Sequence, residues 1–184
     1  DLEPLFAQLA KAIEAPEDAL RQVQDFYTQR LQVQLREKGY SFGLAALGVQ
    51  LMWNRPLQVQ RILSSYASVQ GEAWFKALVT AAVRVKNILS KAGDFPKEVI
   101  SGHFREEEEQ ALFDTVSSLR PSVEAALKRS AWQEVTELLF KLEPDVTRFF
   151  DKVLVMDEDP AVRGNRLSLL DQCNELFKSV GDLG

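Results

Sequence analysis

The chain has 184 residues, of which 46% are hydrophobic and 27% charged, and its formal net charge is −5 at pH 7. This length and composition favour one globular domain, residues 1–184, with a sizeable core. No apolar run approaches the roughly 20 residues that a membrane-spanning helix needs, and no signal-peptide pattern opens the chain. We therefore expect a cytoplasmic protein, and because its first residue is Asp1, a fragment of a longer one.

The first part of the chain predicts four helices, from apolar residues at helical spacing and from proline and glycine at the boundaries. They are expected at residues 2–14, 17–38, 42–53 and 56–69. Pro16 ends the first helix, Gly39 ends the second, and Pro56 begins the fourth. Six apolar side chains of the second helix are expected to face inward: Leu20, Val23, Phe26, Tyr27, Leu31 and Leu35.

The remainder of the chain also has helical periodicity, interrupted by an irregular connection at 93–105. Helical segments are expected at 72–91, from 106 to Pro121, at 122–128, 132–142 and 144–153, and from 160 to about 180. No strand-like alternation and no Gly-rich phosphate loop occurs. The sequence therefore predicts an all-α fold, a helical bundle of about eight to nine helices.

The segment 72–91 is the most regular amphipathic helix of the chain. Its apolar face is expected to contain Trp74, Leu78, Ala81, Ala82, Val85, Ile88 and Leu89. The opposite face has a polar row: Lys76, Thr80, Arg84, Asn87 and Lys91. At about 1.5 Å per residue this row spans roughly 22 Å, long enough to follow several nucleotides of a single strand. An ordinary solvated helix face has the same appearance, so the row alone does not establish a binding site.

Charge is distributed unevenly along the chain. Residues 55–105 contain eight Lys/Arg and three Asp/Glu, whereas residues 1–54 contain five and seven, and residues 106–184 contain nine and seventeen. The middle section is therefore basic by five charges within an acidic molecule, and a polyanion would be attracted to it.

Few residues are of the types that catalysis or metal binding needs. The chain has one cysteine and one histidine, so neither a Cys/His metal cluster nor a histidine-activated nucleophile is expected. Cys173 is expected to be a buried thiol, and His103 a loop residue. The run Glu106 to Glu109 is interpreted as a solvated acidic cluster that complements a helix dipole. Paired carboxylates for acid–base or metal chemistry would need partners that the sequence does not supply.

The last helix begins at Asp159 and Pro160, since aspartate caps free backbone N–H groups and proline presets φ for the first turn. One face of this helix is apolar and is expected to contain Val162, Leu169, Leu170, Cys173, Leu176, Phe177 and Val180. Arg166 falls on the same face, where a guanidinium needs an anionic partner. That partner is either an internal carboxylate, from Asp151, Asp157 or Glu158, or an anionic ligand.

Three stretches resemble the DALR anticodon-binding domain, most closely the one at the C-terminus of bacterial-type glycyl-tRNA synthetase β subunits. The first is Phe149 to Leu170, in which the family tetrad reads Asp159-(Pro160)-Ala161-Val162-Arg163, with valine where leucine is usual. The second is Val83 to Leu89, which contains the Arg84-x-x-Asn87-Ile88-Leu89 pattern. The third is Phe26 to Tyr40, with its Arg30-Leu31 pair and Gly39-Tyr40. The resemblance spans nearly the whole chain and implies a helical anticodon-binding fold.

The resemblance also implies a function and partners. Glycine tRNA would be the ligand, and a separate α subunit would bind ATP and glycine, so no cofactor and no catalytic residue is expected in this chain. Six residues are expected to contribute to tRNA binding, in a groove between the polar row and the Asp159 turn: Arg30, Arg84, Asn87, Arg163, Asn165 and Arg166. The alternative is a helical protein–protein or subunit-docking module without RNA binding, which the acidic total charge and the apolar helices favour. A metal-dependent helical hydrolase is more distant, because one histidine leaves too few ligands.

Overall fold

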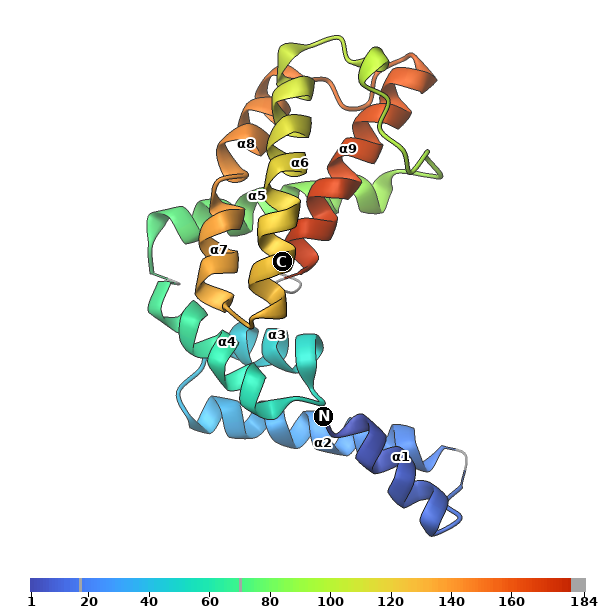
Figure 1. Ribbon diagram of the computed structural model, residues 1–184, viewed down its shortest axis with the longest axis vertical. Coiled ribbons are helices and arrows are strands. Elements are labelled where there is room, and N and C mark those ends of the chain that lie inside the picture. Colours follow the sequence, from blue (N-terminus) through green and yellow to red (C-terminus); the bar gives the residue numbers. More distant parts are fainter. Residues whose placement is uncertain (17, 70, 180–184) are drawn as a thin grey trace. The chain divides into compact units, whose positions relative to one another are not determined.

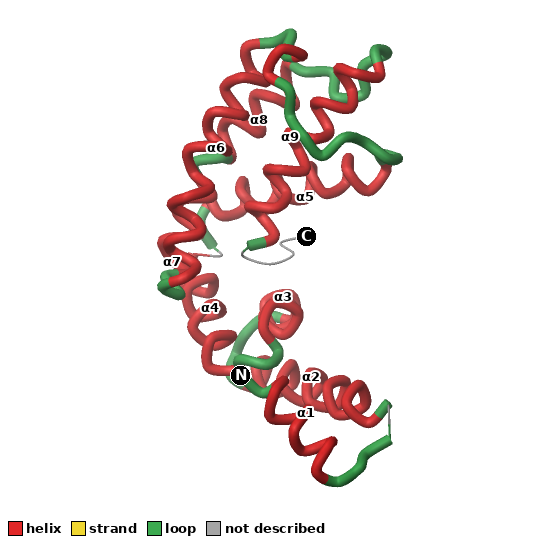
Figure 2. The backbone as a smooth tube through the Cα atoms, turned by 45° about the vertical axis from the view of Figure 1, so that its right-hand side comes forward, coloured by secondary structure: helices red, strands yellow, loops and turns green. Residues whose placement is uncertain are grey.

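The computed structural model describes residues 1–16, 18–69 and 71–179, and this part of the chain consists of helices and connections without a strand (Figures 1 and 2). The predicted all-α fold is thereby confirmed. The chain divides into two compact units, Asp1–Val69 and Gln70–Gly184, and each is described by itself. A single domain of 1–184 stays a prediction.

The first unit contains four helices, α1 (Glu3–Ala12), α2 (Ala19–Glu37), α3 (Phe42–Met52) and α4 (Pro56–Val69). Gly39 follows α2 with a φ of 94°, a left-handed conformation that favours glycine. Ser41 then caps α3, because its side chain accepts from the Leu44 N–H at 3.3 Å. The core of this unit lies mainly between α3 and α4 and includes Leu44, Ala45, Val59, Ile62, Leu63 and Tyr66.

The predicted inward face of α2 is only partly correct. Leu31 and Leu35 are buried, but Phe26 is 73% exposed, and Leu20 and Val23 are also exposed. α2 packs on α1 and α3, and the residues Glu3–Ala12 of α1 include no buried one. Helical periodicity identified an apolar face here, but the part of it at the start of α2 is exposed to solvent.

The second unit contains α5 (Ala73–Lys91), α6 (Glu107–Lys128), α7 (Trp132–Phe140), α8 (Glu143–Lys152) and α9 (Pro160–Lys178), with a 3₁₀ turn at Ser101–His103. Figure 1 shows α9 beside α6, and α9 also packs on α5. All the residues from Gly164 to Leu170 are buried. The predicted apolar stripe is confirmed from Val162 to Phe177, whereas Val180 lies outside the described residues. The helix starts as expected, with the Asp159 carboxylate accepting from the Ala161 N–H at 2.9 Å.

The prediction of separate helices on either side of Pro121 is wrong, because α6 is continuous from Glu107 to Lys128. Proline removes one helical hydrogen bond and favours a break. However, the apolar face continues across it, with Leu119 and Val123 both buried, while Pro121 itself is exposed. Packing of this face therefore outweighs the local effect of proline. No helix among the described residues is long and apolar enough to cross a membrane.

Candidate functional site

Arg166 forms the centre of a buried hydrogen-bonded network near the start of α9. Its Nε donates to Glu109 Oε1 at 3.0 Å and its Nη2 to Glu109 Oε2 at 3.2 Å. Nη1 donates to Asp157 Oδ2 at 2.8 Å and to the carbonyl oxygen of Leu154 at 2.9 Å. The side chain is only 3% exposed. The expected internal ion pair with Asp157 is confirmed, and Glu109 is a partner that the sequence pattern did not indicate.

Glu109 also caps α6. Its Oε2 accepts from the backbone N–H groups of Arg105 and Glu106 at 2.8 and 2.9 Å, in a capping box with Glu106. Burial acts to raise the pKa of Glu109, but the hydrogen bonds from Arg166, Arg105 and Glu106 and the charge of Arg166 together hold that pKa below 4.5. The interpretation of the 106–109 run as wholly solvated is therefore wrong for Glu109, which is fully buried. The Glu-x-x-Glu spacing was the signal that could have identified the cap.

Asn165 holds the connection between α5 and α6. Its Oδ1 accepts from the Ile100 N–H at 2.7 Å, and its Nδ2 donates to the Ile100 carbonyl at 3.1 Å. One turn further along α9, the Ser168 hydroxyl donates to the Pro96 carbonyl at 2.6 Å. Gly164 allows this close approach, because a Cβ there would lie 3.0 Å from Pro96 Cδ. The amide of Asn165 is thus engaged in ordering the connection.

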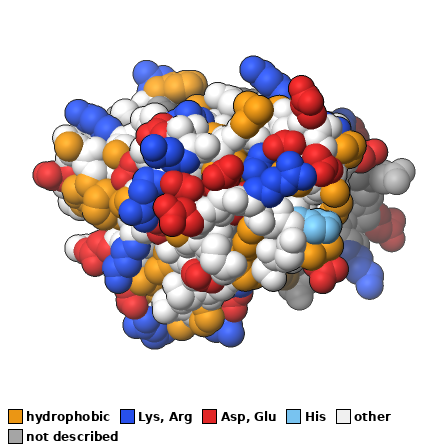
Figure 3. Space-filling model, turned by 90° about the horizontal axis from the view of Figure 1, so that it is seen from above, with side chains coloured by type: hydrophobic (Ala, Val, Ile, Leu, Met, Phe, Trp, Pro, Cys, Tyr) orange, Lys and Arg blue, Asp and Glu red, His pale blue; other side chains and the backbone are white. Residues whose placement is uncertain are grey.

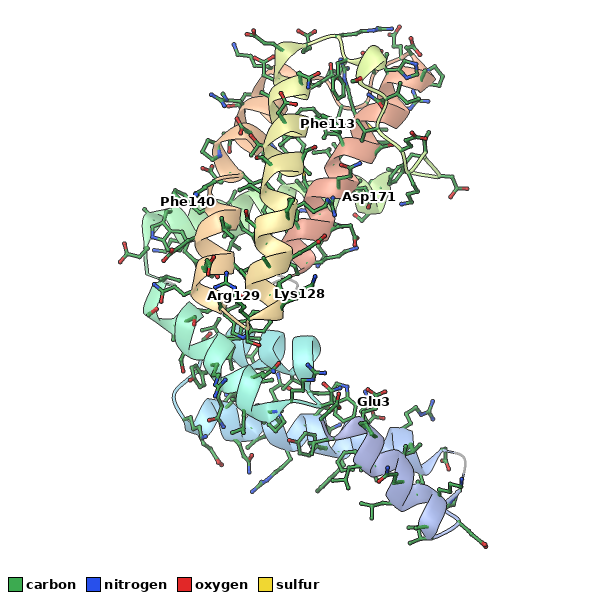
Figure 4. The ribbon with its side chains drawn as sticks, in the orientation of Figure 1. Glu3, Phe113, Lys128, Arg129, Phe140 and Asp171 are labelled. Atoms are coloured by element: carbon green, nitrogen blue, oxygen red, sulfur yellow. The ribbon has the colours of Figure 1, made fainter. Side chains whose placement is uncertain are left out.

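Two further contacts hold the connection between α5 and α6 against α9 and α6. Lys97 pairs with Asp171 of α9, which is labelled in Figure 4, at 2.8 Å. The Phe104 ring lies 5.8 Å from that of Phe113 on α6. The irregular segment 93–105 therefore has a defined path against α6 and α9.

Arg163 and Arg105 both contact the loop between α8 and α9. The Nη1 of Arg163 donates to the Asp157 carbonyl at 2.8 Å. Arg105 pairs with Asp159 at 2.6 Å and approaches Asp157 at 3.8 Å. The hydrogen bond from the Asp159 N–H and the charges of Arg166 and Arg105 lower the pKa of Asp157, although burial acts to raise it. This loop is therefore held by three arginines, of which Arg105 was not among the predicted residues.

The polar row of α5 lies in solvent, as predicted. Lys76, Thr80, Arg84, Asn87 and Lys91 are all exposed, while the other side of the helix is buried at Leu78, Ala81, Ala82 and Val85. The row is thus open to a ligand along the whole helix.

Arg84 is the member of this row that also contacts α8. Its guanidinium carbon lies 4.4 Å from the centre of the Phe150 ring, and its Nη1 lies 3.8 Å from Asp151 Oδ1. Asp151 thus pairs with Arg84 and not with Arg166.

The six predicted residues fall into three places. Arg84 and Asn87 are exposed on α5; Arg163, Asn165 and Arg166 follow one another on α9; and Arg30 is exposed on α2 in the first unit. The three α9 residues form hydrogen bonds to backbone and carboxylate groups of the protein itself. Their position therefore does not support direct contact with RNA. A single groove joining the α5 row to the Asp159 turn stays a prediction.

Cations and anions are interspersed on the surface. On the face shown in Figure 3, Lys and Arg side chains alternate with Asp and Glu side chains. Within the described residues, no group of three or more His, Cys, Asp or Glu side chains could hold a metal ion.

Comparison with known proteins identifies the family. Residues 78–183 match the family described as the DALR anticodon binding domain. The chain is 34% identical over 196 residues to the glycine–tRNA ligase β subunit of Desulforudis audaxviator, an alignment that covers 100% of this chain and 27% of the relative. With the β subunit of Thermodesulfovibrio yellowstonii the identity is 31% over 163 residues, covering 88% and 24%. With that of Neisseria meningitidis serogroup C it is 37% over 132 residues, covering 68% and 19%.

The chain thus spans about a quarter of the length of the first two relatives. The matched residues include α5 from Leu78 onward and the whole of α6, α7, α8 and α9. The match thus contains the Arg166 network and every member of the exposed row except Lys76. Because more than half of the chain matches this family, the chain belongs to the DALR anticodon-binding domain family, and the relatives to which it is similar are glycine–tRNA ligase β subunits.

Proposed function

We propose that the chain binds glycine tRNA as the anticodon-binding part of a cytoplasmic glycine–tRNA ligase β subunit. ATP and glycine would bind a separate α subunit, which is the protein partner in this proposal. The observation that carries it is the exposed α5 row, because all of its members except Lys76 lie within the residues that match an anticodon-binding family.

The physical requirements of anticodon recognition agree with this surface. Unpaired nucleotides are bound by cations that contact phosphates, by flat side chains on which bases stack, and by amides that reach base edges. The α5 row supplies all three types, with Lys76 and Lys91 near its two ends, Arg84 in its middle and Asn87 one turn further on. The buried asparagine and arginine of α9 support this surface indirectly. The asparagine orders the connection between α5 and α6, and the arginine orders the connection between α8 and α9.

A filter-binding titration with glycine tRNA at several salt concentrations tests the proposal. The double variant Lys76→Gln/Lys91→Gln should bind more weakly, and the slope of log K against log salt should become shallower by about 0.7 for each phosphate that the variant no longer neutralises. The matched control is Lys128→Gln/Lys141→Gln, which removes two exposed charges from outside the row. Equal binding by the row variant and the control would contradict the proposal.

The second candidate is a protein-docking module, and one observation in the first unit favours it. Large apolar side chains are exposed along α1, the turn after it and α2: Leu5, Leu9, Ile13, Leu20, Val23 and Phe26. Patches of this kind mark interaction sites. If the protein retains no glycine tRNA at any salt concentration, docking becomes the better proposal for the whole chain.

A further inference from the structure

Arg84, in the middle of the α5 row, has its guanidinium over an aromatic ring. Its guanidinium carbon is 4.4 Å from the centre of the Phe150 ring, well within the roughly 6 Å of a cation–π contact. Half of the side chain is still exposed. A planar guanidinium with an aromatic ring on one side has its other side free to stack.

The ring beneath Arg84 is itself anchored in the core. Phe150 meets Phe149 edge-on, with the ring centres 5.8 Å apart and the planes at 80°, and Phe149 is fully buried. Asp151, the next residue of α8, lies 3.8 Å from Arg84 Nη1. Phe150 and Asp151 thus both favour this position of the Arg84 side chain, which lowers the conformational entropy that is lost when a ligand binds.

We infer that Arg84 is a stacking platform for one unpaired nucleobase, with Phe150 as the residue that positions it. Asn87 is exposed one turn further along the same face, where its amide can both donate to and accept from the edge of a stacked base. This inference rests on the proposed function and adds the chemistry of the contact: a base, and not a phosphate, occupies the site.

The ion pair with Asp151 favours a base over a phosphate. A phosphate would have to compete with this carboxylate for the guanidinium, and it would be repelled by the carboxylate's charge. Asp151 remains 61% exposed, so its negative charge faces the same solvent. Stacking on the free side of the guanidinium leaves the Arg84–Asp151 pair intact and needs no added positive charge.

The experiment combines protein variants with glycine tRNA that has a single abasic nucleotide at each anticodon-loop position in turn. Arg84→Lys keeps the charge but loses the plane, and Phe150→Leu keeps an apolar side chain but loses the ring. Each should weaken binding of intact tRNA by about tenfold or more without changing the salt slope. Against tRNA that is abasic at the one position held by the platform, the same variants should cause no further loss.

A spectroscopic readout separates stacking from a merely structural role. The fluorescent base 2-aminopurine is placed at the anticodon-loop position that the abasic series identifies. Binding to the wild type should quench the 2-aminopurine fluorescence, and saturating Arg84→Lys protein should quench it less. Asp114→Asn is the matched control, because it removes an exposed carboxylate of α6 and leaves the platform residues in place, and it should not weaken binding. Thermal melts of all the variants show whether each is folded.

Two results would overturn the inference while leaving the proposed function in place. The first is a phosphate contact: Arg84→Lys would then bind with wild-type affinity, whereas Arg84→Gln would bind more weakly and with a salt slope shallower by about 0.7. The other is a loss of affinity that is the same for every abasic tRNA. Absence of any tRNA binding by the wild-type protein would overturn both proposals.

Discussion

The Glu109 carboxylate accepts a hydrogen bond from Arg166 Nε at 3.0 Å across 57 residues of sequence. The same carboxylate caps α6 through two backbone N–H groups, and the same guanidinium holds the loop before α9 through Leu154 and Asp157. One buried pair therefore fixes the starts of two helices and the connection between α8 and α9.

Replacing Arg166 with alanine should destabilise the protein strongly. Glu109 would remain buried without its cation, and removal of one partner of a buried pair typically costs about 3 to 5 kcal/mol. The midpoint of urea unfolding measures this loss. The control is Glu107→Gln, an exposed member of the same acidic run, which should have little effect. Similar midpoints for Arg166→Ala and this control would argue against a buried pair.

Acid should destabilise the protein through the same network. The pKa of Glu109 is lowered from 4.5 when the protein folds, so its contribution to the unfolding free energy is fully present above about pH 4.5 and is lost as the pH falls through its folded-state value. The pKa values of Asp157 and Asp159 are also lowered, from 3.8, and act in the same direction at lower pH.

The variant Glu109→Gln isolates this contribution. It should be less stable than the wild type at neutral pH but should lose less stability on acidification, because the ionised group is absent. Urea unfolding from neutral pH down to about pH 3 measures both slopes. Parallel slopes for the variant and the wild type would show that Glu109 does not contribute to acid sensitivity.

Asn165→Ala should loosen the connection between α5 and α6. The Ile100 N–H, which now donates to Asn165 Oδ1 at 2.7 Å, would lose its partner, and its exchange with solvent should accelerate by about tenfold or more. Amide hydrogen exchange of Ile100 is the measurement. The exposed Asn87→Ala provides the comparison, since it should leave this amide protected. Unchanged exchange in Asn165→Ala would mean that other contacts hold the connection.

Gly48→Ala should destabilise the first unit although alanine is the better helix former. A Cβ at this position would lie 2.7 Å from Val59 Cγ1 and 3.0 Å from Leu63 Cδ1. Both neighbours are fully buried, and the branched Val59 has little rotamer freedom, so the expected cost is about 1 to 3 kcal/mol. Thermal melting checks this, with Gly93→Ala as the control because a Cβ there meets nothing within 4 Å.

Much of the fold follows from local features of the sequence. The Asp159-Pro160 start of α9 was predictable because capping and the fixed φ of proline act within a single turn. The outward row of α5 was predictable because helical periodicity alone separates Arg84 from Leu78. Arg166 could be expected to need an acidic partner, since its place on an apolar face is visible in the sequence.

Tertiary structure decided which groups satisfy these requirements. Glu109 is distant in sequence from Arg166, so no local pattern identifies it as the partner of this arginine; only the packing of α6 against α9 brings its carboxylate to the guanidinium. The same holds for Phe150 beneath Arg84, which depends on how α8 lies against α5. Helix propensity and capping act within one or two turns, whereas ion pairs and ring contacts depend on the spatial arrangement of whole helices.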